Sequence, residues 1–148
     1  MDKKDWTILD VMQQDGRIAM QNLASQISMS GTAAAERVRN LEKEGIITGY
    51  KANVNAEKLG YNVHCFVLTE TSLAARDKFY EYVQACPEII NAYYTTTGGK
   101  ELVLEMYCAS TDDLYRIQED LFGLAQCTTY IVANHPVKQK GITPLPKK

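Results

Sequence analysis

The spacing of apolar residues changes near Gly45, and this change determines what the chain can fold into. Before Gly45, apolar residues recur at the three- to four-residue spacing of helices with one buried side. After it, short runs rich in β-branched and aromatic residues alternate with two helical stretches. We therefore expect an α+β chain in which a helical unit precedes a mixed one.

Three helices are predicted before the change, over residues 5–14, 20–27 and 31–44. Asp5 is the expected N-cap of the first and Ser30 of the third, and Gly45 supplies a left-handed residue that ends the third. Two short helices joined by a few residues and packed on a preceding helix form a helix-turn-helix. Residues 46–54 are expected to be extended, so residues 1–54 are predicted to form a winged helix-turn-helix domain.

The second unit, residues 62–137, follows a linker at 55–61 and precedes a basic tail at 138–148. Its order is strand 62–71, helix 74–85, strand 89–97, strand 101–108, helix 111–124 and strand 128–137, with a Gly98-Gly99 turn as the hairpin signal. This order predicts a ferredoxin-like βαββαβ domain, whose sheet has one face without helices. We expect a homodimer through that face, with Phe66, Tyr93, Tyr94, Tyr107 and Tyr130 as interface residues.

Charge, cysteine and hydropathy patterns limit the function. The net charge of −2 argues against a nucleic-acid partner, but residues 1–52 carry seven basic and seven acidic groups, whereas residues 60–137 carry four and ten. If either half approaches DNA, it should therefore be the first. No Cys-x-x-Cys pair is present, so the cysteines are expected to be buried, reduced thiols. No apolar run approaches the roughly 18 residues that cross a bilayer, and we expect a cytoplasmic protein.

The motifs of the first half resemble those of the leucine-responsive/asparagine-type (Lrp/AsnC, feast/famine) regulators of bacteria and archaea. The resemblance is carried by Leu9-Asp10, Gln14-Asp15-Gly16-Arg17-Ile18, Leu23-Ala24, Ser30 and the dense run from Glu36 to Ala52. It continues through Leu59-Gly60 and, more loosely, through Thr97-Gly98 and the last strand. It implies a sequence-specific DNA-binding transcription regulator that forms dimers and often octamers and responds to an amino acid or related metabolite.

The same resemblance locates an effector site in the hairpin. Family members hold an amino acid there, at an interface between dimers, which implies effector contacts from Thr97, Gly98, Gly99, Lys100 and Glu101. Backbone N–H groups around paired glycines suit a carboxylate, and Glu101 suits an α-ammonium group. The alternative is a tight hairpin without a ligand.

Three positions depart from the family pattern. Ser28 stands where a glycine is usual in the turn, at a cost of about 1 kcal/mol if the residue is left-handed. Gly31 replaces a proline after the capping serine, and Glu101 replaces an aspartate in the effector loop.

Helix geometry assigns the DNA contacts within the third helix. With Val38 at the centre of the buried side, Ala34 and Leu41 fall beside it, and a polar face points the opposite way. That face is expected to meet base edges in the major groove, with two arginines flanking toward phosphates and helix N-termini adding backbone contacts. The predicted DNA-contacting residues are Gln21, Asn22, Ser30, Gly31, Thr32, Ala33, Glu36, Arg37, Arg39 and Asn40. The alternative for each arginine is an ion pair with Glu36, Asp10 or Glu42.

Two other function classes are compatible with parts of the sequence. The siroheme decarboxylases resemble this family and use histidine near a tetrapyrrole, which makes His64 and His135 the candidates for an enzyme; each is better explained as a strand-surface or turn residue. No nucleophile-base grouping is present, so we expect no catalytic residues, cofactor or metal ion. A protein-interaction module that has lost DNA binding is the third alternative, favoured by the neutral first domain and Ser28.

Overall fold

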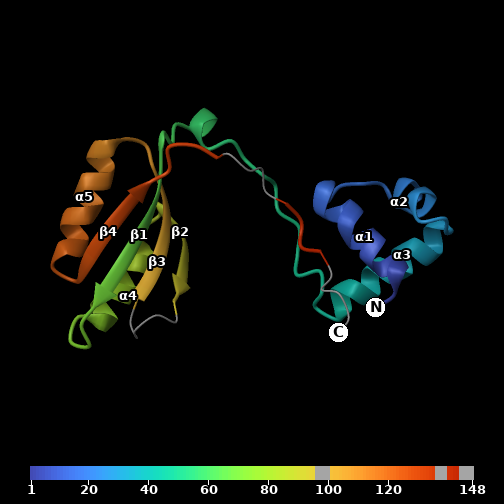
Figure 1. The fold of residues 1–148 in the computed structure, drawn as a ribbon, viewed down its shortest axis with the longest axis horizontal. Coiled ribbons are helices and arrows are strands. Elements are labelled where there is room, and N and C mark those ends of the chain that lie inside the picture. The colour runs from blue at the N-terminus through green and yellow to red at the C-terminus, as the bar shows by residue number, and fades with distance from the viewer. Residues whose placement is uncertain (96–100, 136–139, 144–148) are drawn as a thin grey trace. The chain divides into compact units, whose positions relative to one another are not determined.

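The computed structural model describes residues 1–95, 101–135 and 140–143 (Figure 1). The chain divides into two compact units, Met1–Asn53 with Val137–Lys148, and Val54–Pro136. The sequence instead placed residues 138–148 in a separate tail. Within the described chain, no helix has the length and apolar character needed to cross a membrane.

The first unit consists of three helices, α1 (Lys3–Gln14), α2 (Met20–Gln26) and α3 (Gly31–Lys43), as predicted. They share one apolar core, made by Ile8, Met12, Leu23, Ala24, Ile27, Ala34, Val38 and Leu41. The predicted N-cap of α1 is wrong. Asp2 caps the helix, accepting hydrogen bonds from the Lys4 and Asp5 N–H groups, and the Asp5 side chain accepts one from the Asp2 N–H group. Asp5 therefore completes a capping box.

The connection between α2 and α3 requires a left-handed residue. Ser28 has φ 51° and is the one non-glycine residue with positive φ in the described part of the chain. Ser30 caps α3 as predicted, because its hydroxyl accepts a hydrogen bond from the Ala33 N–H group at 3.2 Å. Gly45, at φ 69°, follows the end of α3 in the predicted left-handed conformation.

The described segment after α3 forms no strand over residues 46–54, where an extended segment was predicted. The predicted linker contains one short 3-10 helix, Glu57–Leu59, which ends at Gly60 with φ 92°. Residues 140–143 contact α1, since the Gln13 side-chain amide donates to the Ile142 carbonyl and accepts from the Ile142 N–H group.

The second unit is the predicted βαββαβ domain. Its elements are β1 (Val63–Thr71), α4 (Arg76–Ala85), β2 (Ile89–Tyr94), β3 (Glu101–Cys108), α5 (Thr111–Phe122) and β4 (Ala125–Ile131). The four strands are antiparallel in the order β2-β3-β1-β4. The last strand begins at Ala125 and ends at Ile131, so the predicted range of 128–137 is wrong. The Gly98-Gly99 turn lies outside the described residues.

Both helices pack on one face of this sheet (Figure 1). Phe79 of α4 and Ile117 and Leu121 of α5 are fully buried there with Val67 and Leu104 of the sheet. The opposite face, called the open face below, carries alternate residues of each strand: His64, Phe66, Leu68, Glu70, Asn91, Tyr93, Val103, Glu105, Tyr107, Gln126, Thr128 and Tyr130.

Tyr94 does not belong to the open face, where the sequence had placed it. It pairs with the buried Leu102 of β3, and its ring lies 6.2 Å from that of Tyr80 on α4. A register shift in β2 between Ile89 and Asn91 changes which residues of the strand lie on each face of the sheet. Simple alternation along the strand does not predict this assignment.

Candidate functional site

The predicted orientation of α3 is confirmed. Ala34, Val38 and Leu41 are buried in the helical core, and the opposite side of the helix is exposed at Thr32, Glu36 and Asn40. Ala33 and Gly31 are half-buried at the start of the helix. The exposed side of α3 is therefore polar and offers hydrogen-bonding groups that can meet base edges.

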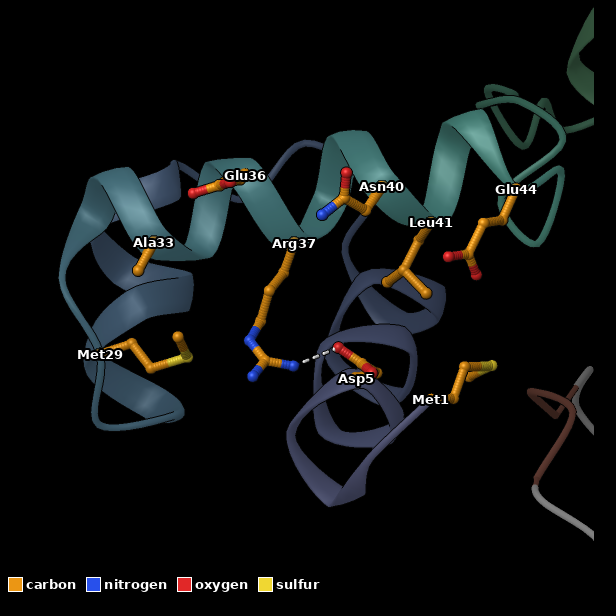
Figure 2. A pocket seen from close by; sticks show the side chains of 9 residues that line it. All are labelled: Met1, Asp5, Met29, Ala33, Glu36, Arg37, Asn40, Leu41 and Glu44. Carbon is orange, nitrogen blue, oxygen red and sulfur yellow. Dashed lines mark hydrogen bonds and ion pairs between the residues drawn. The ribbon is translucent and has the colours of Figure 1, made fainter.

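Arg37 is held by two acidic side chains at the start of the first helix, and Figure 2 shows its contact with one of them, Asp5. Its Nη1 lies 2.6 Å from Asp5 Oδ1 and 2.8 Å from Asp2 Oδ2. The hydrogen bond to Asp5 is the largest cause of a raised pKa at Arg37, followed by the hydrogen bond to Asp2. The alternative of an ion pair thus applies to Arg37, although its partners are not Glu36, Asp10 or Glu42. No sequence pattern identified Asp2, because the pairing joins residues far apart in the chain.

Arg39 differs from Arg37 in its surroundings. It is exposed, and among the described residues it forms no ion pair. It lies one residue from Asn40 on the exposed side of α3. A long cation without an acidic partner is free to bind a phosphate, and Arg39 therefore fits the predicted phosphate contact better than Arg37 does.

The N-terminal ends of α2 and α3 lie together. A Cβ atom built on Gly31 would be 3.9 Å from Gln21 Cγ, which is ordinary van der Waals contact. Gln21 and Asn22 are exposed in the first turn of α2, and Ser30 is exposed at the cap of α3. The structure thus brings Gln21 beside Gly31 and Ser30, where N–H groups of two helix ends can meet a phosphate.

The predicted effector loop is largely outside the described residues. Thr97, Gly98, Gly99 and Lys100 fall in the undescribed segment at 96–100. Glu101 is the first residue of β3, where its backbone pairs with Glu70 of β1. The five effector contacts stay predictions.

The two histidines, distant in sequence, come together beside the open face. His64 Nδ1 lies 3.4 Å from His135 Nε2, and His64 Nε2 lies 3.0 Å from Glu105 Oε1. Residues 1–95, 101–135 and 140–143 contain no group of three or more His, Cys, Asp or Glu side chains arranged to hold a metal ion. No local pattern of residues predicts this pairing, because it depends on the chain turning back after β4.

All four cysteines lie in the second unit as free thiols, and the prediction that they are buried is confirmed for two of them. Cys65 and Cys108 are fully buried, whereas Cys86 and Cys127 are half-buried. Burial raises the pKa of the Cys108 thiol to about 12, and the neighbouring Cys65 adds to this shift. A thiol with so high a pKa is not a nucleophile at neutral pH.

Comparison with known proteins agrees with both units. Residues 1–48 match a family model described as winged helix-turn-helix DNA-binding, and residues 64–142 match the Lrp/AsnC ligand binding domain. The regulator LrpC of Bacillus subtilis is 30% identical over 132 residues, covering 89% of this chain and 91% of LrpC. The regulatory protein DoeX of Halomonas elongata is 34% identical over 140 residues, covering 89% and 87% of the two chains.

Solved structures show the same architecture. The structure of Bacillus subtilis LrpC superposes with a TM-score of 0.86 at 28% identity, covering 94% of this chain and 99% of LrpC. The regulator NMB0573 of Neisseria meningitidis, solved in complex with L-Met, gives a TM-score of 0.87 at 22% identity and covers 96% of each chain. At that identity the second similarity concerns the fold.

The fold and these matches together define a two-domain transcription regulator. The chain belongs to the Lrp/AsnC family, as its motifs had indicated. It is a DNA-binding regulator of transcription and not an enzyme, which sets aside the decarboxylase alternative.

Proposed function

We propose that the exposed side of α3 reads the bases of a DNA major groove while Arg39 binds a backbone phosphate. The observation that carries this proposal is the contrast between two neighbouring arginines, Arg37 paired with two carboxylates and Arg39 exposed and unpaired within the described chain. Base contacts come from Thr32, Ala33, Glu36 and Asn40. Backbone contacts come from Gln21, Asn22, Ser30 and Gly31 at the two helix ends.

The test compares the two arginines on one duplex. Fragments that the full chain retains from genomic DNA supply the duplex, and binding is measured over a range of salt concentrations. Arg39→Ala should weaken binding to every sequence and reduce the slope of log K against log salt by about 1, because one phosphate contact is lost. Arg37→Ala, measured well below its own unfolding temperature, should leave the slope nearly unchanged. An unchanged slope in Arg39→Ala would remove that residue from the interface.

We infer that two copies associate through the open face. Tyr93 and Tyr130 are 53% and 55% exposed there, beside the half-buried Phe66 and Val103. An aromatic, partly apolar sheet face of this kind is normally covered in solution by another surface. A second copy of the same face is large enough to cover all four strands at once. Paired chains would carry two α3 helices, one for each half-site of a DNA duplex. Larger assemblies, such as the octamers implied by the family resemblance, would build on this dimer.

Sedimentation of purified variants tests the pairing. Tyr93→Asp should shift the full chain from dimer to monomer, because a carboxylate at a buried face lacks a partner. Tyr115→Asp is the control, since Tyr115 lies on α5 and is 65% exposed away from the open face. Dimers of equal stability in both variants would place the interface elsewhere.

We propose further that the second unit binds an amino acid or related metabolite at the loop between β2 and β3. Support comes from the match of residues 64–142 to a ligand binding domain and from the Neisseria regulator, which was solved with L-Met. The paired glycines and Glu101 would bind the carboxylate and the ammonium group of such a ligand, respectively. A regulator of this kind acts in the cytoplasm, where both the chromosome and free amino acids are present.

Thermal unfolding with each of the twenty amino acids tests the effector. A ligand at 100 times its Kd should stabilise the wild type by about 2.7 kcal/mol. Glu101→Gln should remove that gain, whereas Glu119→Gln, an exposed carboxylate on α5, should keep it. If no amino acid raises the unfolding temperature of the wild type, the effector is of another class or absent.

A further inference from the structure

The side chain of His64 is held in a single orientation by three neighbours. Its ring stacks on that of Tyr107 with centroids 4.2 Å apart and planes 3° from parallel. Its Nε2 lies 3.0 Å from Glu105 Oε1, and the other oxygen of that carboxylate accepts a hydrogen bond from Asn91 Nδ2 at 2.8 Å. The imidazole is 12% exposed and Glu105 is 19% exposed. This half-buried arrangement fixes which way each ring nitrogen points.

The contact with Glu105 also determines where the lone pair of His64 lies. A carboxylate accepts hydrogen bonds, so the proton of the neutral ring is on Nε2. The lone pair of Nδ1 then points toward His135, whose Nε2 is 3.4 Å away. The two rings are nearly parallel, with 15° between their planes and 5.3 Å between their centroids. Two nitrogen atoms thus face one small space, which accepts either a shared proton or a cation.

The spacing of these nitrogens matches that of two ligands on one metal ion. Two nitrogens bound at 2.0–2.1 Å to a tetrahedral zinc ion lie about 3.4 Å apart. Metal-bound histidines commonly donate their other N–H group to a carboxylate, which fixes the tautomer and makes the ligand more basic. Glu105 occupies that position at His64. The exposed side of His135 leaves room for water to complete the coordination.

We propose that His64 and His135 together chelate a divalent transition-metal ion of the zinc or copper class, with Glu105 as the positioning residue for His64. Imidazole nitrogens favour Zn²⁺, Cu²⁺ and Ni²⁺ over Mg²⁺ and Ca²⁺, which take oxygen ligands. The bound ion would tie β1 to the segment after β4, since His64 lies on β1 and His135 lies beyond Ile131. This site lies on the open face that the dimer proposal covers, and it is independent of the DNA and effector proposals.

Calorimetric titration of the full chain with Zn²⁺, in a buffer that does not bind metals, tests the proposal. One ion should bind per chain. His64→Gln and His135→Gln should each weaken binding by at least about ten-fold, and Glu105→Gln by about 10- to 100-fold through the loss of orientation. Glu119→Gln is the matched control and should bind as the wild type does. Because the chain has two histidines in all, the double variant also removes any other imidazole site.

Binding of Cu²⁺ gives a spectroscopic signal that distinguishes coordination by the two histidines from a purely structural role of these residues. Electron paramagnetic resonance of the Cu²⁺-loaded wild type should show coupling to two imidazole nitrogens, reduced to one in His135→Gln. His135 is exposed, so this variant should keep the wild-type unfolding temperature without metal. Absence of Zn²⁺ binding by the wild type, or wild-type affinity in the double variant, would overturn the proposal and leave the contact as a hydrogen bond between two imidazoles.

Discussion

The guanidinium of Arg37 on α3 lies 2.6 Å from the carboxylate of Asp5 on α1, in the first turn of that helix. The same guanidinium nitrogen contacts Asp2, the N-cap of α1. Arg37 therefore has a structural role, because it connects α3 to α1. The neighbouring Arg39 has no such contact among the described residues, so its guanidinium is available for the proposed contact with a DNA phosphate.

This relationship predicts opposite effects for the two arginines on stability. Arg37→Ala should lower the unfolding temperature of the protein measurably, because it removes two ion pairs and leaves the cap of α1 without its cation. Arg39→Ala should leave the unfolding temperature nearly unchanged, as expected for an exposed side chain. Calorimetric unfolding of both variants checks this, and equal unfolding temperatures would contradict the structural role of Arg37.

The cap of α1 predicts a dependence of stability on pH. Hydrogen bonding from the Asp5 N–H group is the largest cause of a lowered pKa at Asp2, and Arg37 lowers it further. Because the folded pKa is below the ordinary value of 3.8, ionised Asp2 stabilises the fold at neutral pH. That contribution is lost as pH falls through the folded pKa.

Asp2→Asn isolates this charge, because asparagine also serves as an N-cap. Urea unfolding should show the variant to be less stable than the wild type at neutral pH, with the difference shrinking below about pH 4. A difference that stayed constant into acid would mean that the charge of Asp2 plays no part.

The left-handed residue in the helix-turn-helix predicts a stabilising substitution. Ser28 at φ 51° has a strained backbone that glycine adopts freely, so Ser28→Gly should stabilise the first unit by up to about 1 kcal/mol. Gly45→Ala is the control in the opposite direction, because it places a side chain at a left-handed residue and should destabilise the fold. No atom lies within 4 Å of the added Cβ, so the cost of about 1 kcal/mol would come from its φ of 69° alone. Urea unfolding measures both, and a destabilised Ser28→Gly would show that the serine side chain stabilises the turn.

Tyr50 predicts a second pH effect in the alkaline range. Desolvation of its hydroxyl raises the pKa of Tyr50 to about 12 although the side chain as a whole is half exposed, and the hydrogen bond it donates to Glu42 at 2.8 Å adds to this shift. A folded pKa above the unfolded value of 10.0 means that Tyr50 stabilises the fold below that pH and loses this contribution as pH rises toward 12. Ultraviolet titration of the wild type minus Tyr50→Phe should show this late ionisation, and Glu42→Gln should move it toward the ordinary value. A difference titrating near pH 10 would contradict the contact.

Local signals predicted the helices well. The apolar spacing of α3, its Ser30 cap and the Gly45 end each involve residues within one or two turns, and all three are confirmed. The buried side of α3 followed from the same spacing. The cap of α1 was misplaced because Asp2 and Asp5 both suit an N-cap, and the choice depends on a reciprocal capping box and on Arg37, a residue of another helix.

Contacts between distant segments were not predictable in this way. The last strand begins at Ala125 because Ala125 pairs with Thr71 of β1, although its first residues are not strong strand formers. Tyr94 faces the helices because a register shift precedes it in β2. The meeting of His64 with His135 depends on the path of the chain after β4. For Ala125 and Tyr94 the position in the sheet depends on the paired strand, whose register is not encoded locally. For the histidines it depends on the path of the chain beyond β4.

Base discrimination by α3 can be measured position by position along a duplex. Affinities of the wild type, Asn40→Ala and Arg39→Ala are compared on a retained duplex and on every single-base substitution of it. Asn40→Ala should lose about 1–3 kcal/mol of discrimination at one base position and keep it elsewhere, whereas Arg39→Ala should weaken all duplexes equally. Discrimination by Asn40→Ala identical to that of the wild type at every position would contradict the account.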